Sequence, residues 1–170
     1  MFTINPFEAM SDRSQSEQKF ISFQLGLDRI ALLPLESVTE LFQLPVAEIL
    51  PVPEVPSCVL GIYNWREEML WLADLNALTG FPALGEKDGL LRSPMTIVIQ
   101  AKERSLGLVV PQVKDIENLD MKQLKPPEGG VFTPKLFPFL QGYFVSETNQ
   151  ILPLLNPQAI IQTPAFLASS

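Results

Sequence analysis

Proline is the feature that most limits how this chain can fold. The 170 residues include 16 prolines, roughly twice the average share of about 5%. Because proline ends or kinks a helix, few proline-free stretches are long enough for an ordinary helix. The remaining stretches alternate apolar and polar residues and contain many β-branched and aromatic side chains, which is typical of strands. We therefore predict a mainly β protein.

The predicted elements are short strands separated by turns. Nine stretches have the strand pattern: 19–25, 29–34, 37–43, 58–65, 69–73, 94–101, 105–110, 142–147 and 151–154. Short helical turns are predicted at 74–78 and 157–161, and residues 115–125 are amphipathic but short, with no strand assigned to them. A total of about nine or ten strands exceeds what one small open sheet holds and indicates barrels or a sandwich. No internal repeat of fixed period is visible.

The length favours one compact domain, or two small units that share a core. Residues 1–18 are polar and lack periodicity, so we predict a flexible N-terminal arm. Residues 19–162 form the predicted folded domain, and residues 163–170 form a C-terminal tail.

The residue inventory excludes several classes of function. The 19 acidic and 12 basic residues give a formal net charge of −7, and a negative surface repels nucleic acid and anionic lipid headgroups. The chain has no histidine, which is the commonest general base and metal ligand. The single cysteine, Cys58, cannot form an internal disulfide or a cysteine zinc site. We therefore predict no enzyme activity, no metal, no cofactor and no nucleic-acid partner.

The expected compartment is the cytoplasm. Residues 1–10 contain no basic residue and no apolar run typical of a secretory signal. The longest uncharged stretch, 148–170, is interrupted by Pro153, Pro157 and Pro164, so we predict a strand, a turn and a tail rather than a membrane helix. No direct insertion into a membrane is expected.

Two groups of residues have chemistry worth weighing. Glu67, Glu68 and Asp74 lie near Trp65 and Trp71 in the sequence, and paired carboxylates beside aromatic rings are compatible with a carbohydrate-active or ligand-binding β-barrel. The alternative is that the glutamates point into water and the tryptophans belong to the core.

The second group centres on Arg66, at the end of an apolar strand. Its planar guanidinium can be held by a carboxylate while it presents free donors to a partner. Glu40 is the candidate carboxylate, on the same strand face as Val38 and Phe42. The alternative is an ordinary surface arginine with an ion pair worth about 0–1 kcal/mol.

The order of several motifs resembles the CheW-like coupling proteins of bacterial chemotaxis. The family pattern is a proline-bracketed lead-in, then apolar-Gly-apolar-x-Asn-x-Arg-Gly, then an apolar strand that ends in Asp-Leu. This sequence matches it in the segment ILPVPEVPSCVLGIYNWREEMLWLADLNALTG at 49–80. An opening FISFQLG at 20–26, a V-x-E at 38–40 and SLGLVVPQVKDI at 105–116 follow the family order as well. The resemblance covers residues 19–161.

This resemblance implies an all-β fold of two packed, closed five-stranded SH3-like barrels with one or two short helices. It also implies a non-catalytic cytoplasmic adaptor that couples a chemoreceptor or photoreceptor signalling domain to the regulatory domain of a CheA-type histidine kinase, recruited to membrane-bound receptor arrays. By the family pattern, the receptor groove contains Arg66, Glu40, Val38, Asn64 and Trp65. The resemblance further implies a partner surface on the second barrel with three members, Val109, Val113 and Asp115, of which the two valines have an alternative interpretation as barrel core.

The sequence departs from the family pattern at the arginine turn. The glycine that follows the arginine in the family is Glu67 here, which adds a Cβ and a negative charge beside Arg66. The departures point to a divergent member that serves a dedicated motility pathway, such as pilus-driven or light-directed movement. A further alternative is a module that has lost receptor contact and binds a motor or pilus protein through the 65–71 hairpin.

Overall fold

The computed structural model describes residues 16–85 and 93–167, and shows two five-stranded sheets. The first sheet has the order β8-β1-β2-β10-β9, with β1 (Glu17–Leu25), β2 (Arg29–Pro34), β8 (Val113–Asp120), β9 (Leu140–Val145) and β10 (Ile151–Leu155). The second has the order β3-β6-β7-β5-β4, with β3 (Val38–Gln43), β4 (Val59–Trp65), β5 (Glu68–Asp74), β6 (Met95–Ala101) and β7 (Arg104–Val110).

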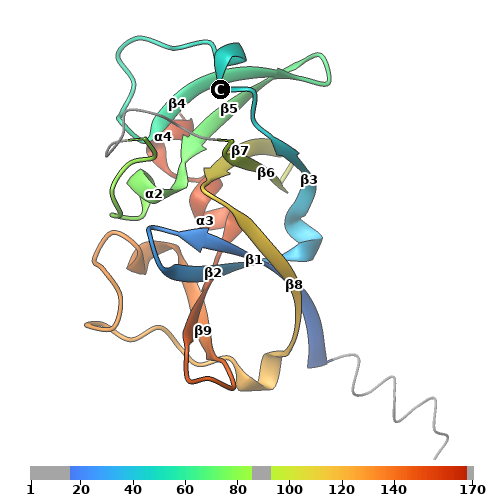
Figure 1. Ribbon diagram of the computed structural model, residues 1–170, viewed down its shortest axis with the longest axis vertical. Coiled ribbons are helices and arrows are strands. Elements are labelled where there is room, and N and C mark those ends of the chain that lie inside the picture. The colour runs from blue at the N-terminus through green and yellow to red at the C-terminus, as the bar shows by residue number, and fades with distance from the viewer. Residues whose placement is uncertain (1–15, 86–92, 168–170) are drawn as a thin grey trace, which may run out of the picture.

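The helices are short. They are α2 (Leu75–Leu78), α3 (Pro157–Ile161), α4 (Pro164–Leu167) and the 3-10 turns η1 (Leu35–Ser37), η2 (Val46–Glu48), η3 (Met121–Gln123) and η4 (Phe137–Phe139). Asp74 caps α2 by accepting a hydrogen bond from the backbone N–H of Ala77, and Asn156 caps α3 in the same way. In Figure 1 the second sheet lies in the upper half and the first in the lower half, with α3 between them.

The two sheets repeat one topology, although the sequence shows no repeat. In each sheet a central antiparallel hairpin (β1 with β2, β6 with β7) pairs in parallel with one strand of a second hairpin (β10 with β9, β5 with β4). A further antiparallel strand, β8 or β3, completes each order. Each sheet also has one isolated antiparallel bridge to its β9 or β4 edge, Lys125 with Tyr143 and Leu50 with Ile62.

Three apolar clusters hold the sheets together. The largest combines both sheets and the helices, for example Ile21 and Phe23 of β1 with Ile97 of β6 and Ile160 of α3. Each of the other two belongs to one sheet, since alternate residues of a strand point to opposite faces. They are the second-sheet cluster (Leu44, Trp65, Leu70, Leu72, Val98 and Val109) and the first-sheet cluster (Phe20, Leu32, Phe144, Leu152 and Leu154).

The structure confirms the all-β, SH3-like fold with two five-stranded units and corrects the expectation of closed barrels. In the described part of the chain, no strand pairing joins β8 to β9 or β3 to β4. We call the gap between the two edge strands of a sheet its seam, so β8 and β9 flank the first seam and β3 and β4 the second. The backbone ladder of each unit is open at its seam.

Local predictions differ from the structure at a few positions. Residues 113–120 form strand β8 instead of an unassigned amphipathic segment, because they pair with residues 17–23 of β1. Residues 17 and 18 of the predicted arm belong to β1, and the rest of the arm up to residue 15 lies outside the described residues, as do residues 86–92 of the predicted 81–92 loop. The predicted tail contains α4, whose Phe166 is buried in the largest cluster.

Candidate functional site

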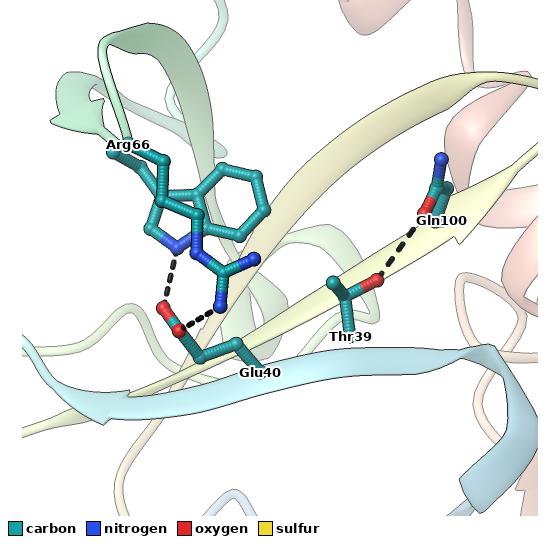
Figure 2. A network of polar contacts seen from close by, with 5 residues as sticks. Thr39, Glu40, Arg66 and Gln100 are labelled. Atoms are coloured by element: carbon teal, nitrogen blue, oxygen red, sulfur yellow. Dashed lines mark hydrogen bonds and ion pairs between the residues drawn. The ribbon is translucent and has the colours of Figure 1, made fainter.

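A cluster of three side chains bridges the second seam. Glu40 of β3 accepts a hydrogen bond at Oε2 from Nε1 of Trp65 at 2.5 Å, and its Oε1 lies 2.6 Å from Nη2 of Arg66. Figure 2 shows Glu40 and Arg66 pointing toward each other from the two edges of the sheet. One carboxylate therefore joins the end of β4 to β3, where the backbone ladder does not.

The β4–β5 turn sets the position of Arg66. Only Arg66 and Glu67 separate β4 from β5, and both have positive φ values, 50° and 65°. Two consecutive left-handed residues form the kind of turn that matches the twist of a hairpin. The register of this tight turn leaves Trp65 facing inward, 8% exposed, and projects Arg66 outward with 60% of its side chain exposed.

The cluster is electrostatically matched. The hydrogen bond from the Trp65 indole, followed by the hydrogen bond and charge of Arg66, lowers the pKa of Glu40 against the opposing effect of partial burial. The Arg66 guanidinium carbon also lies 4.9 Å from the centre of the Trp65 ring, within the range of a cation–π contact. Because one guanidinium edge is held this way, the remaining donors of Arg66 are presented to solvent.

The other predicted receptor-side residues lie around this cluster. Val38 does not share the predicted strand face with Glu40, because a β-bulge between them pairs Val38 with Ile99 and Glu40 with Val98, and Val38 is half-buried against the largest apolar cluster. Asn64, the residue before Trp65, is exposed and lies opposite Met69 of β5. The structure therefore brings Glu40, Trp65 and Arg66 into contact and leaves Val38 and Asn64 as flanking residues.

The second predicted surface is not one surface. Val109 lies in β7 of the second sheet with no exposed area, as its alternative interpretation as barrel core expects. Val113 and Asp115 lie instead in β8 of the first sheet. Val113 is half-buried, and Asp115 is exposed.

Sequence reasoning paired Glu40 with Arg66 but missed the role of the indole. Phe42 of β3 also stacks on Tyr63 of β4, with ring centres 5.3 Å apart, so aromatic contact extends along the second seam. The alternation of Glu40 and Phe42 on one strand face is the local signal for both contacts, and the bulge before Glu40 leaves Val38 on the other face. The position of their partners depended on long-range pairing.

The two tryptophans do not form the stacking platform that a sugar site requires. Trp65 is buried in the second-sheet cluster, and Trp71 is half-buried against the largest cluster. Among residues 16–85 and 93–167, no group of three potential ligands is arranged to hold a metal ion. No helix in those two ranges is long and apolar enough to cross a bilayer.

Comparison with known families agrees with this arrangement. The family model of the CheW-like domain matches residues 19–165. The chain belongs to the CheW-like family. Members of this family are non-catalytic scaffold adaptors, and the matched range contains both sheets and the second seam.

Two relatives and one solved structure resemble this CheW-like chain. It is 34% identical to Chemotaxis protein CheW of Rhizobium meliloti (strain 1021) over 76 residues, which is 45% of this chain and 46% of that protein, so the alignment spans less than half of the relative. It is 25% identical to Protein FrzA of Myxococcus xanthus over 160 residues, 93% of this chain and 94% of that protein. The crystal structure of the scaffolding protein TtCheW from Thermoanaerobacter tengcongensis superposes with a TM-score of 0.73 at 20% identity, covering 87% of this chain and 90% of that one, and shows the shared fold.

Proposed function

We propose that this CheW-like protein couples a chemoreceptor or photoreceptor signalling domain to a CheA-type histidine kinase in a motility pathway. The observation that supports the proposal is the Glu40–Trp65–Arg66 cluster, which holds one exposed guanidinium in a fixed orientation. A rigidly held arginine with free donors recognises carboxylates on a partner surface. The name of one relative, Chemotaxis protein CheW, points to the same class of pathway.

The receptor contacts the second seam in this proposal. Arg66 supplies the charged donors, Glu40 and Trp65 orient it, and the proposed contact includes the neighbouring residues Asn64 on β4 and Val38 on β3. Val113 and Asp115 of β8 remain the candidates for a second partner surface, whereas the buried Val109 contributes to the core. In this proposal the protein acts in the cytoplasm and is recruited to receptor arrays. The domain at 19–162 makes all of these contacts.

Co-purification tests the kinase contact. Purified protein is mixed with the regulatory domain of each CheA-type kinase from its own host and analysed by size-exclusion chromatography. Co-elution with at least one of them supports the proposal. Failure with every such kinase contradicts it.

The Arg66→Ala variant tests the receptor contact. We expect loss of receptor-dependent control of kinase activity with kinase co-elution retained, because Arg66 is exposed and its removal leaves the candidate second partner surface on β8 unchanged. Lys122→Ala is the matched control, because it removes an exposed cation from η3, the turn that follows β8 of the first sheet. Unchanged coupling in Arg66→Ala would contradict the proposal and favour a module that binds a motor or pilus protein through the 65–71 hairpin.

A titration with oligosaccharides, followed by tryptophan fluorescence, separates the adaptor from a carbohydrate-binding barrel. Since Trp65 is buried and its indole N–H is engaged by Glu40, we expect no change in emission. A saturable change would favour the carbohydrate-binding alternative.

A further inference from the structure

The repeated topology allows positions in the two sheets to be compared. Each sheet contains a row of paired residues that runs from one edge strand to a glycine on the other. In the second sheet this row is Glu40, Val98, Gly107, Leu72 and Gly61. In the first sheet it is Asp115, Ser22, Leu32, Leu154 and Gly142. Asp115 is therefore the counterpart of Glu40.

The partners of Glu40 have no counterparts in the first sheet. Counting from Gly61 and Gly142 along the edge strands, Trp65 and Arg66 correspond to Ser146 and Glu147. A small hydroxyl and a carboxylate thus occupy the positions of the indole and the guanidinium. Within residues 16–85 and 93–167, the single ion pair is that of Arg66 with Glu40, so Asp115 has no cation against it.

A cleft of about 820 Å³ lies at the first seam, between β8 and β9. Its lining is apolar toward the first-sheet cluster, with Ile30, Leu119, Phe144 and Leu152. Its charged lining is predominantly acidic, with Asp115, Glu117, Asp120 and Glu147 against Lys114 and Lys125. Asp115 and Glu117 share a strand face with Leu119, so acidic and apolar surfaces follow one another along the cleft.

The strand edges beside the cleft have backbone groups that point away from their neighbouring strands. The N–H and C=O of Tyr143 bind the backbone of Lys125, on the side of β9 away from β10. Because backbone groups alternate with a period of two, the N–H and C=O of Val145 point to the same side. On β8 the N–H and C=O of Asp115 both form hydrogen bonds with the Ser22 hydroxyl on β1 and therefore point toward β1. Asn118 lies three residues later, so its N–H and C=O point away from β1. Lys125 shows that an extended segment fits beside β9.

We propose that this cleft binds an extended segment of a partner protein. The segment pairs with the backbone of Asn118 on the β8 edge and of Val145 on the β9 edge, beyond the Lys125 bridge, in the manner of strand addition to a sheet edge. The inward side chains of the segment are apolar beside Phe144 and Leu152 and basic beside Asp115. The basic side chain is an arginine, whose guanidinium supplies the cation that Arg66 provides at the other seam. This site lies on the other sheet from the receptor contact and does not depend on it.

Two labelled heptapeptides test the proposal. Arg-Thr-Arg-Thr-Val-Thr-Val and its reverse sequence place arginines at one end and valines at the other on a single strand face, in both possible directions. Binding is measured by fluorescence anisotropy against the full chain at low salt. We expect saturable binding of at least one peptide, and weaker or no binding when glutamate replaces arginine. No saturation by either peptide, or equal binding of the glutamate versions, overturns the proposal.

Variants and hydrogen exchange establish where the peptide binds. Asp115→Asn removes the charge and keeps an oxygen for the Ile116 N–H that Asp115 now accepts, and we expect binding to weaken by about fivefold. Glu103→Gln removes an exposed carboxylate from the β6–β7 turn and should leave binding unchanged. The peptide should also slow amide exchange at Asn118 and Val145. Equal binding by Asp115→Asn, or absence of that protection, overturns the proposal. The proposal is also overturned if the protein self-associates without peptide and its amides at Asn118 and Val145 are then protected to the same degree.

Discussion

The two seams of this protein have the same topology and are closed in different ways. Side chains close the second seam, through the Glu40 contacts to Trp65 and Arg66 and the stack of Phe42 on Tyr63. Each seam also has one isolated backbone bridge, Leu50 with Ile62 or Lys125 with Tyr143, and apart from its bridge the first seam is a cleft. Strand order alone therefore does not decide whether an edge is satisfied internally or left for a partner.

The difference originates in the turns that follow the edge strands. The β4–β5 turn has two residues and delivers Trp65 and Arg66 to the opposite edge. The β9–β10 turn is longer, and its first residue, Ser146, uses its backbone N–H and its hydroxyl within the turn, with Gln150 and Thr148. The Ser146 side chain at the end of β9 is thus engaged within its turn and does not cross the first seam.

Truncating the indole should have the largest effect. Trp65→Ala removes a buried side chain that fills the second-sheet cluster and bridges the seam, and we expect a loss of about 3–5 kcal/mol in the free energy of unfolding. Ser146→Ala, at the corresponding position of the first sheet, should lose about 1 kcal/mol from its turn hydrogen bonds. Urea unfolding at neutral pH measures both. Similar losses would show that the two seams do not differ in the way described.

The two seams share a requirement for glycine beside their isolated bridges, because neither position has room for a Cβ. A Cβ at Gly61 would lie 2.4 Å from the Leu50 carbonyl oxygen, and a Cβ at Gly142 would lie 2.5 Å from that of Lys125. Each Gly→Ala change should cost about 1–3 kcal/mol by crowding, with the larger cost at Gly61 because its φ of +145° disfavours a side chain.

Gly129→Ala is the matched control for these two changes, because nothing lies within 4 Å of a Cβ at that position. Its free energy of unfolding should stay within about 0.5 kcal/mol of the parent. An equally small effect of Gly142→Ala would mean that the Lys125 bridge is not a fixed part of the first seam.

Most strands were predictable because their signals are local. The β6–β7 hairpin has clear apolar alternation with a polar turn, and the 29–34 strand was predicted with the bounds of β2. Strand β8 was missed because its exposed face holds charges and its only satisfied edge is against β1, about a hundred positions earlier in the chain. The pairing that reveals it is non-local and leaves no period in the sequence.

The candidate site was predictable only in part for the same reason. The alternation of Val38, Glu40 and Phe42 is a local pattern that predicts a partner for Glu40, and the predicted pairing with Arg66 is present. The bulge that turns Val38 to the other face leaves no local signal. The indole contact, the burial of Val109 and the position of Asp115 on the other sheet all depend on which strands are neighbours. The correspondence of the two seams became visible only from the paired rows.

A smaller effect is expected where this chain departs from the family glycine. Glu67 has a left-handed backbone, with φ of 65°, which costs an ordinary residue roughly 1–2 kcal/mol. Glu67→Gly should therefore stabilise the second seam by about 1 kcal/mol, after allowance for the greater freedom of glycine in the unfolded chain. Glu103→Gly is the control, since Glu103 has a φ of 66° in the other two-residue turn of the same sheet. A gain at Glu103 without one at Glu67 would indicate that the Glu67 side chain contributes contacts that offset its strain.

The smallest effect concerns the charge that closes the second seam. Hydrogen bonds from Trp65 and Arg66 lower the pKa of Glu40 below its ordinary value of 4.5, so the folded chain binds a proton at this position less readily than the unfolded chain. Glu40 therefore adds stability above about pH 4.5, and this contribution is lost as the pH falls through its lowered pKa. Glu40→Gln keeps an oxygen for the indole but cannot titrate, so the difference in unfolding free energy between the parent and this variant should shrink between about pH 7 and about pH 3. A difference that stays constant over that range would mean that the carboxylate charge does not stabilise the second seam, and that shape and apolar contact alone distinguish it from the first.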